Sequence, residues 1–387
     1  MEMNLIDVPA GLKGVVAAET AIGDVRGTEG VYHYGPYDAT ELAQRCTLEE
    51  VWHLLLRGRL PSAAEAAELG DRLRAERRLP PGLVDGLRVV AAGGGPFLAR
   101  LRSALSLAAA ARGCRPVLDL TPSEREADAV ALAALTPTLV GALAQLAAGR
   151  APLADRDDLD HAAHYLWSCT GRQPGPEEAR AVEQYLISTI DHGFNASTFT
   201  ARVIASTGAD VGAALVGGLG ALSGPLHGGA PSRALAALDE IGDAGNAPAW
   251  VRAALARGDK VMGFGHAVYS APDPRSRLLH DIARRLGGPR LAHAEAVEAQ
   301  VLETLRELKG GRDLPTNVEF YAGIVMDRCG LPPELFTPTF AVSRVIGWSV
   351  HVLEQAAAGK IIRPSARYVG PWPLVAVPRE PVGANPR

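Results

Sequence analysis

The sequence predicts an all-α protein, and three observations support that fold class. Aromatic residues make up only 5% of the chain, and alternating runs of valine, isoleucine and threonine are almost absent. Long stretches rich in alanine, leucine, arginine and glutamate recur between glycine and proline residues, which is typical of helices separated by turns. A length of 387 residues favours one large domain plus a smaller one.

Two segments carry signals for the start of a helix. Residues 47–50 (TLEE) have the composition of a capping box and precede the apolar run at 51–56. Pro176, followed by two glutamates, begins a second predicted helix that extends through Ile190. Short pieces near residues 31–34 are the predicted exceptions to the helical pattern.

Residues 129–149 carry no charge over a length that could cross a bilayer. Most of them are alanine, which contributes little transfer free energy, and Pro137 lies in the middle. A pair of helices buried in a large domain or at a dimer interface is therefore favoured over a membrane span. The N-terminus is acidic and precedes no apolar signal region, so we expect a cytoplasmic protein.

Charge and cysteine content exclude two further classes of protein. The net charge of -4 provides no basic field for a nucleic-acid backbone, so nucleic acid is not expected as a partner. The four cysteines are far apart and have no metal-binding spacing, which indicates reduced thiols. His161 and His164 are three residues apart, but no third ligand is near in sequence, so we predict a solvated helix face and no metal site.

Glycine-rich joints divide the chain into outer parts and an inserted middle segment. Residues 1–228 are predicted to form the first part of a large domain, and residues 229–328 a small mobile domain. Residues 329–387 would complete the large domain and end in an extended, proline-rich tail.

Three histidines lie in separate loops of small residues, and a carboxylate follows in a fourth segment. They are His192, His227, His266 and Glu319. Histidine changes charge near neutral pH and can give or take a proton, while flanking glycines let the backbone approach a substrate. This pattern is typical of an active site assembled from loops.

Several ordered motifs are similar to those of the citrate synthase family. They are residues 195–203 (NASTFTARV), 224–230 (GPLHGGA), 263–269 (GFGHAVY), 273–275 (DPR), 335–338 (LFTP) and 343–345 (SRV). The resemblance runs from residue 11 to residue 371, nearly the whole chain. It implies a mostly helical, two-domain subunit of a symmetric homodimer that closes its small domain on the substrates and passes its C-terminal tail to the partner.

The resemblance also implies a Si-type acyltransferase of the tricarboxylic acid cycle, which condenses oxaloacetate with acetyl-CoA to give citrate and free CoA. His227 would donate to the thioester oxygen, Glu319 would remove the α-proton, and His266 would polarise the carbonyl of oxaloacetate. A thioester α-proton is so weakly acidic that its removal requires both a base and a donor on the enolate oxygen. The CoA thioester is a substrate, and no metal or organic cofactor is implied.

Substrate-binding residues follow from the same resemblance. Oxaloacetate carries two carboxylates, and arginine binds these as a planar bidentate donor. The implied partners are Arg275, Arg344 and Arg363, with His192 assisting and Arg363 reaching across from the other subunit of the homodimer. Backbone groups of one glycine loop would meet the CoA adenine: Val261, Met262, Gly263, Phe264 and Gly265.

The chain departs from the family pattern at the catalytic carboxylate. Glu319 stands where the family motif has aspartate, and glutamate and aspartate side chains in water differ in acidity by only about 0.4 pH unit. Displacement of the carboxylate by about 1 Å, however, can lower a rate on the order of 100-fold. Near the CoA phosphates, Ser270 and Asp313 lie where many relatives carry basic residues.

Two alternatives therefore stay open at this stage. One is a 2-methylcitrate synthase that uses propionyl-CoA. The other is a catalytically weak paralogue that binds a dicarboxylate or a CoA ester as a sensor or specialised-pathway protein.

Overall fold

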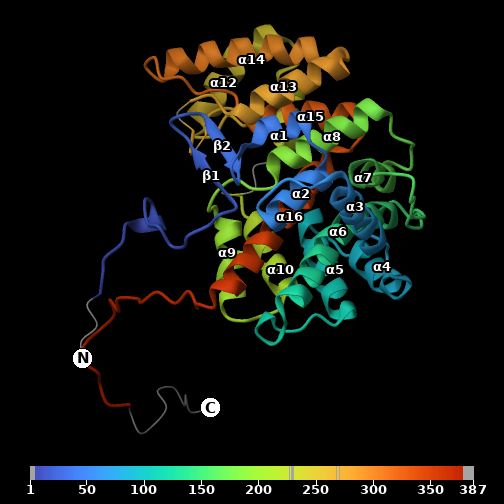
Figure 1. The fold of residues 1–387 in the computed structure, drawn as a ribbon. Helices are drawn as coiled ribbons and strands as arrows, with labels where there is room; N and C mark the ends of the chain where they lie inside the picture. Colours follow the sequence, from blue (N-terminus) through green and yellow to red (C-terminus); the bar gives the residue numbers. More distant parts are fainter. Residues whose placement is uncertain (1–4, 226, 228–230, 267, 270, 378–387) are drawn as a thin grey trace, which may run out of the picture. The chain divides into compact units, whose positions relative to one another are not determined.

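The computed structural model describes residues 5–225, 227, 231–266, 268–269 and 271–377 (Figure 1). The contacts within the chain divide it into two units, Glu19–Ile361 and the paired terminal segments Met1–Ala18 and Ile362–Arg387. The larger unit contains sixteen α-helices and three short strands among the described residues, which confirms the predicted all-α class. The joint predicted at Gly228 and Gly229 lies outside the described residues.

The helices follow one another along the chain with short connections. They are α1 (Ala39–Arg45), α2 (Leu48–Arg57), α3 (Ala63–Glu76), α4 (Val84–Ala92), α5 (Phe97–Arg112), α6 (Pro122–Ala147), α7 (His161–Thr170), α8 (Pro176–Thr189), α9 (Ala196–Ser206), α10 (Val211–Leu222), α11 (Pro231–Ile241), α12 (Ala247–Ala256), α13 (Pro274–Leu286), α14 (Pro289–Leu308), α15 (Val318–Arg328) and α16 (Phe336–Ala358).

Both predicted helix starts are confirmed. The Thr47 hydroxyl accepts from the N–H of Glu50 at 3.3 Å, and the Glu50 carboxylate accepts from the N–H of Thr47 at 2.8 Å. This reciprocal capping satisfies two donors that the first turn of α2 would leave free. Helix α8 begins at Pro176 and ends with Ile190 as its C-cap.

The non-helical pieces predicted near residues 31–34 belong to a small antiparallel sheet. Its strands are β1 (Gly23–Arg26), β2 (Val31–Tyr34) and β3 (Tyr37–Asp38), in the order β1-β2-β3. Tyr32 and Tyr34 alternate with less buried residues along β2, and each is only 1% exposed. The sheet thus directs two tyrosines into the helical core.

The uncharged segment forms one helix, so the predicted helix pair is wrong. Helix α6 continues through Pro137, although proline cannot donate the backbone hydrogen bond expected at that position. Neighbouring helices bury nearly every residue from Ala129 to Gln145, and this packing outweighs the loss of one hydrogen bond. Among the described residues α6 alone has the length and apolar composition of a membrane span, and 89% of its apolar window is buried inside the protein.

The prediction of a solvated face for His161 and His164 is also wrong, because each is only 2% exposed. Helix α7 contacts α3, α6 and α8, which cover this face. The His161 ring packs edge-on against Trp52, with 5.8 Å between ring centroids, and His164 Nε2 lies 2.6 Å from Asp155 Oδ1. Burial lowers the pKa of His161 to about 3 and that of His164 to about 4, so both rings are neutral at pH 7.

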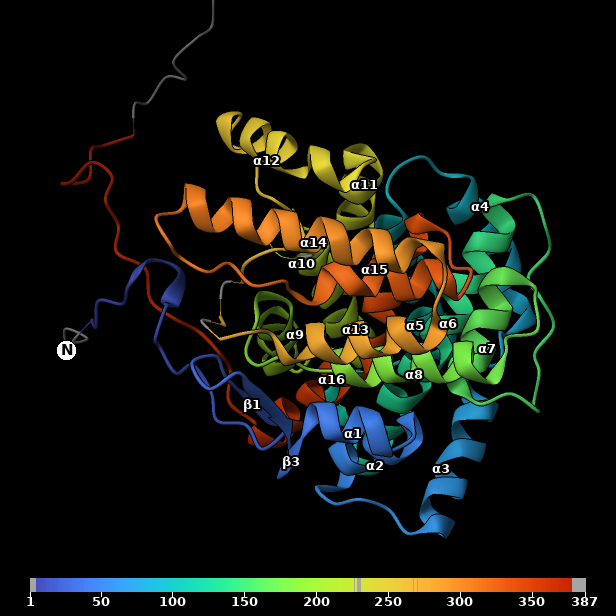
Figure 2. The ribbon, with the colours of Figure 1, turned by 90° about the horizontal axis from the view of Figure 1, so that it is seen from above.

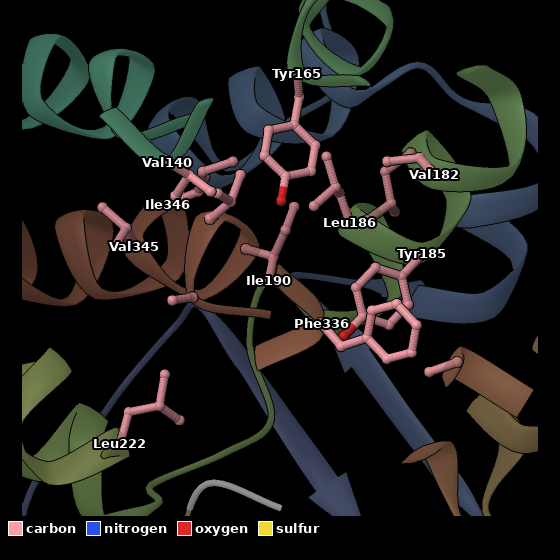
Figure 3. Close-up of a cluster of buried hydrophobic side chains, with 14 of the residues drawn as sticks. Val140, Tyr165, Val182, Tyr185, Leu186, Ile190, Leu222, Phe336, Val345 and Ile346 are labelled. Atoms are coloured by element: carbon pink, nitrogen blue, oxygen red, sulfur yellow. The ribbon is translucent and has the colours of Figure 1, made fainter. Parts of the chain in front are cut away.

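The main core forms where α6, α7, α8 and α16 meet. Helix α16 contacts α6, α8, α9 and α10, and α6 contacts α5 and α7. Figure 3 shows Val140 of α6, Tyr165 of α7, Leu186 of α8 and Ile346 of α16 turned toward one another. These helices supply a rigid base for the loops that follow α8 and precede α16.

The middle segment, predicted as a small domain at residues 229–328, contributes α11 to α15. Helices α11 and α13 contact α15, and α12 contacts α14, so these helices lie side by side (Figures 1 and 2). Helices α13 and α15 also contact α8. The exact boundaries of this domain and its mobility remain predictions.

Side chains from β2 hold the C-terminal end of α8. The last four carbonyls of a helix have no partner within it and need other donors. The Tyr32 hydroxyl donates to the carbonyl of Ser188 at 3.0 Å, and the Tyr34 hydroxyl donates to the carbonyl of Ile187 at 2.9 Å.

Helix α16 binds the same end of α8 from a second direction. The Ser343 hydroxyl donates to the carbonyl of Leu186 at 2.5 Å, and Arg344 Nε donates to the carbonyl of Thr189 at 3.0 Å. Donors from two elements therefore determine where the chain leaves α8, immediately before His192.

Gly347 of α16 packs directly against this helix end, and we expect Gly347→Ala to lower the free energy of unfolding by about 2–3 kcal/mol. A Cβ at this position would lie 2.1 Å from the carbonyl oxygen of Ile190, which is backbone and cannot rotate away. Urea denaturation measures the change.

The matched control is Gly220→Ala in α10, where a new Cβ would meet nothing within 4 Å. Higher helix propensity should then raise stability by about 0.5–1 kcal/mol. Equal stabilities of the two variants would contradict the close packing of α16 on α8.

Candidate active site

Six of the seven predicted catalytic and substrate-binding side chains line one cavity of about 460 Å³. They are His192, His227, His266, Arg275, Glu319 and Arg344. They come from the loops after α8, before α11 and before α13, and from the helices α13, α15 and α16. Arg363, the seventh, belongs to the terminal unit, where its side chain is exposed.

A second cavity of about 730 Å³ contains the predicted CoA-binding loop. Val261, Met262, Gly263, Phe264 and Gly265 all line it. Three cationic side chains, Arg233, Arg257 and Lys260, and the aromatic Trp250 line it as well. His227 and Glu319 line both cavities, so these two residues lie where the cavities meet.

Backbone donors determine which nitrogen of His266 carries the proton. The N–H groups of Val268 and Tyr269 donate to His266 Nδ1 at 3.0 and 3.1 Å. Arg275 Nη2 also faces the ring, 3.3 Å from Nε2, but a neutral imidazole accepts at one nitrogen only. The two shorter bonds from fixed backbone groups favour acceptance at Nδ1, which leaves the proton on Nε2. Burial and then the nearby Arg275 lower the pKa of His266 to about 4. His266 is therefore a neutral N–H donor at pH 7.

The same argument gives the opposite tautomer for His227. The backbone N–H of Ser197 donates to His227 Nε2 at 3.2 Å, and the Ser197 hydroxyl lies 2.8 Å from that atom. A backbone N–H can only donate, whereas the hydroxyl can turn its one proton either to Nε2 or to Asn195 Oδ1. The backbone bond therefore favours Nε2 as the acceptor and Nδ1 as the protonated nitrogen of the neutral ring. Burial, then Arg344, lowers the pKa of His227.

Helix α9 places the Ser197 donor. Asn195 caps this helix, because its Oδ1 accepts from the N–H of Thr198 at 3.1 Å and from the Ser197 hydroxyl at 2.7 Å. The cap fixes the first turn of α9, and with it the atom that orients His227.

His192 lies beside His266 and Tyr269. Its Nε2 is 2.9 Å from the Tyr269 hydroxyl, and its ring meets the His266 ring edge-on with 5.5 Å between centroids. Burial, followed by the charges of Arg275 and Arg344, holds the pKa of His192 well below its usual range. The ring is therefore neutral at pH 7, partly because of the cations beside it.

Glu319 lies in the first turn of α15, where Asn317 Oδ1 accepts from its backbone N–H at 3.0 Å. Within the described residues its carboxylate makes no hydrogen bond or ion pair. Burial raises the pKa of this carboxyl group, and Arg275 and Arg233 oppose that shift. A partly desolvated, unpaired carboxylate is a stronger proton acceptor than one in water.

The two buried arginines differ in their partners. Arg275 pairs with Asp273 through Nε–Oδ1 at 3.0 Å and Nη2–Oδ2 at 2.8 Å, and Asp273 also caps α13. Arg344 is 2% exposed, donates to Thr189 and stacks on Phe340 at 4.6 Å, but pairs with no carboxylate of the described chain. A buried, unpaired cation is unfavourable, so an anionic ligand in this cavity would stabilise it.

The glycine loop is fastened to the start of α15. The Gly265 N–H donates to the carbonyl of Pro315 at 2.8 Å, and the Asn317 N–H donates to the carbonyl of Gly263 at 2.9 Å. Gly263 and Gly265 have φ values of 88° and 75°, in the left-handed region that glycine adopts without strain. These hydrogen bonds therefore join the glycine loop, which lines the second cavity, to the start of α15, which carries Glu319 where the two cavities meet.

Several lining residues were missed because they carry no chemical signature. Ala322 and Phe340 line the first cavity, and they lie three residues after Glu319 and four residues before Arg344. Helical spacing from those two residues was therefore a usable signal. Asp24 and Val25 of β1 also line this cavity, and no sequence pattern connects them to it.

Comparison with known proteins gives a consistent result over nearly the full length. The family model described as citrate synthase, C-terminal domain, matches residues 11–365. A protein of Mycobacterium tuberculosis called putative citrate synthase 2 is 41% identical over 372 residues, which cover 94% of this chain and 93% of that protein. A 2-methylcitrate synthase of the same species is 37% identical over 364 residues, which cover 94% and 91%.

A solved structure agrees with these relatives. Citrate synthase of the archaeon Thermoplasma acidophilum, in a ternary complex with carboxymethyl coenzyme A and oxaloacetate, matches with a TM-score of 0.86 at 27% identity. The match covers 96% of this chain and 99% of that chain.

We expect His266 to remain neutral between pH 6 and 8, with its proton on Nε2. Its pKa of about 4 in the folded state is below the value of about 6.5 for an unfolded histidine. The unfolded chain therefore takes up this proton first, and stability is lost progressively as the pH falls from about 6.5 toward 4. Long-range proton–nitrogen NMR correlations report the tautomer and the titration, with His266→Gln identifying the signal. A midpoint near 6.5 or a protonated Nδ1 would contradict the expectation.

Proposed function

Because the chain belongs to the citrate synthase family, whose members are acyltransferases, we propose that it condenses oxaloacetate with acetyl-CoA to give citrate and free CoA. The observation that carries this proposal is the position of His227 and Glu319 on both cavities. A thioester held between the cavities would have its reacting carbon beside a base and a donor. The dicarboxylate would occupy the first cavity and the CoA the second.

Charge supports this division of the substrates. The first cavity contains the buried Arg275 and Arg344, which would bind the two carboxylates of oxaloacetate with help from His192. Arg233 and Lys260 line the second cavity and would meet the phosphates of CoA. Arg257 lines it as well, but it pairs with Asp259 of the same cavity at 2.8 Å.

The first step forms an enol from the thioester. Glu319 removes a proton from the α-carbon, while His227 Nδ1–H donates to the thioester oxygen as negative charge develops there. A donor already in place at the developing charge lowers the barrier without reorganisation. The neutral form of His227 suits this role, because its Nε2 is engaged by Ser197 and leaves Nδ1–H as the donor.

The second step forms the carbon–carbon bond. The enol carbon attacks the ketone carbon of oxaloacetate, and the enol proton returns to His227 as the thioester carbonyl re-forms. His266 Nε2–H stabilises the charge that moves onto the ketone oxygen. That oxygen ends with one proton, which balances the proton that Glu319 took from the α-carbon. Water then cleaves the resulting citryl thioester, which gives citrate and free CoA. The resident groups are side chains alone, and CoA enters only as part of the substrate.

We further propose that the working unit is a homodimer in the cytoplasm, in which Arg363 of a second copy completes the dicarboxylate site. Arg363 is exposed in a terminal segment whose apolar side chains are exposed as well. Tyr368, Val369, Trp372 and Leu374 have 72%, 90%, 74% and 82% of their surface exposed. Such a segment gains stability from a covering partner. Closure of the small domain would exclude water from the two cavities.

Propionyl-CoA specificity and a weakly catalytic sensor are not favoured over this reaction. Relatives named putative citrate synthase 2 and citrate synthase match nearly the whole chain at 41% and 38% identity, slightly above the 37% of a 2-methylcitrate synthase. Every predicted catalytic group lines the first cavity. A thiol-release assay with oxaloacetate and either acetyl-CoA or propionyl-CoA tests the proposal. Absence of thiol release with acetyl-CoA would contradict the proposal, and release with propionyl-CoA alone would indicate a 2-methylcitrate synthase instead.

We expect Glu319→Gln to lower kcat by at least about 100-fold while oxaloacetate binding is retained, since the amide keeps the volume but cannot accept the α-proton. Glu319→Asp should lower kcat by about 10- to 100-fold, because its carboxylate withdraws from a site built around the longer side chain. Thiol release measures kcat, and calorimetry measures binding. A rate increase in Glu319→Asp would show that the glutamate is poorly placed for acetyl-CoA.

We expect Arg344→Met to weaken oxaloacetate binding by on the order of 100-fold. Stability should change little, because removal of a buried cation with no anionic partner offsets the lost hydrogen bond to the carbonyl of Thr189. The matched control is Arg202→Met. Arg202 is equally buried but pairs with Glu354, so its loss should lower the free energy of unfolding by about 3–5 kcal/mol. Calorimetric titration and urea denaturation separate the two effects. If both variants lose the same stability, Arg344 is not an unpaired cation.

A further inference from the structure

A buried chain of polar side chains connects α16 with the loop that carries His192. Arg202 of α9, His351 of α16 and Asp191 are 2%, 1% and 2% exposed. Arg202 Nη1 lies 3.0 Å from His351 Nδ1, and His351 Nε2 lies 3.1 Å from Asp191 Oδ1. None of the three is among the described residues that line the two cavities.

The chemistry of arginine determines the tautomer of His351. A guanidinium group can only donate, so Nδ1 accepts and Nε2–H donates to Asp191. The second oxygen of Asp191 accepts from the N–H of Gly193 at 3.2 Å. His351 thus occupies one carboxylate oxygen, and the backbone beyond His192 occupies the other. The carboxylate fixes the chain on both sides of His192.

Arg202 is itself held in place by α16. It forms an ion pair with Glu354, and its Nε donates to Gln355 Oε1 at 3.0 Å. Arg202 lies on α9, whose first turn contains Ser197, the donor that orients His227. The C-terminal part of α16 therefore fixes both the loop that bears His192 and the helix that orients His227.

We propose that His351 is a positioning residue for the reaction, which acts by holding Asp191 and the segment from His192 to Ser197. This inference rests on the proposed roles of His192 and His227. Removing one member of a buried polar network leaves its partners unpaired and lowers stability as well as changing geometry, so kcat/KM is compared per folded molecule. The histidine supplies an acceptor and a donor at the two ends of one rigid ring, which an aliphatic side chain cannot do.

Two substitutions test this role. His351→Phe keeps the ring volume but leaves Asp191 and Arg202 without their partner, and we expect kcat/KM to fall by about 10- to 100-fold. His351→Gln retains an amide donor and a carbonyl acceptor, and it should stay within about 5-fold of the unmodified protein. Recovery by glutamine would separate hydrogen bonding from simple filling of the core.

The matched control lies on the same helix. Thr339→Val removes a buried hydrogen bond to the Tyr165 hydroxyl, which is 2.7 Å from Thr339 Oγ1. This variant should lose stability without losing kcat/KM per folded molecule. If Thr339→Val lowers kcat/KM as much as His351→Phe does, His351 has no particular role in positioning and the proposal is overturned.

A double-mutant comparison tests the route through His192. If His351 acts by placing that ring, His351→Phe should lower kcat/KM much less in a His192→Ala background than in the unmodified protein. Equal losses in the two backgrounds would overturn this route.

An NMR measurement keeps this test independent of turnover. We expect His351→Phe to shift the ring nitrogen signals of His192 and His227, and Thr339→Val to leave them in place. If the unmodified protein releases no thiol but His351→Phe still shifts these ring signals, the proposed function is refuted and the positioning role is supported. Unchanged signals in an active protein would refute the positioning role alone.

Discussion

The free carbonyl groups at the C-terminal end of α8 are the constraint on which the rest of the site depends. Every α-helix leaves its last carbonyls without internal partners. Here the donors come from β2 and α16, which lie near opposite ends of the sequence. These hydrogen bonds fix the point at which the chain leaves α8, and they therefore fix the position of His192, two residues beyond the helix C-cap. Arg344 has two roles, because it donates a hydrogen bond to the end of α8 and also lines the first cavity.

Protonation in the site is governed by backbone geometry as much as by charge. His266 and His227 are both neutral, yet their protons lie on different nitrogens because different backbone N–H groups donate to them. A neutral imidazole can therefore present Nε2–H at one of these residues and Nδ1–H at the other. Three buried or half-buried histidines share a small volume with two arginines, and any positive charge on the rings would be strongly disfavoured.

The fold class and the three histidines of the candidate site could be predicted because their signals are local, whereas Arg275, Arg344 and the role of Glu319 followed from the family resemblance. A capping box at Thr47 and glycine-flanked histidines are visible in a few neighbouring residues. What could not be predicted depends on packing between remote segments. The burial of His161 is caused by helices that cover α7, and the role of His351 follows from its contact with Asp191, 160 residues earlier. The contribution of Arg363 and the limits of the small domain depend on a second copy or a second conformation, so they stay predictions.

The lone guanidinium of Arg344 has a consequence for the way this protein can evolve. Its burial without a counter-ion among the described residues is unfavourable for the protein alone, and the dicarboxylate that we propose for this cavity would offset that cost on binding. Selection for heat resistance alone would favour an apolar residue at this position, whereas selection for turnover opposes the same change. Lineages that retain the reaction must therefore gain thermal tolerance elsewhere, in helix caps, loops or subunit contacts.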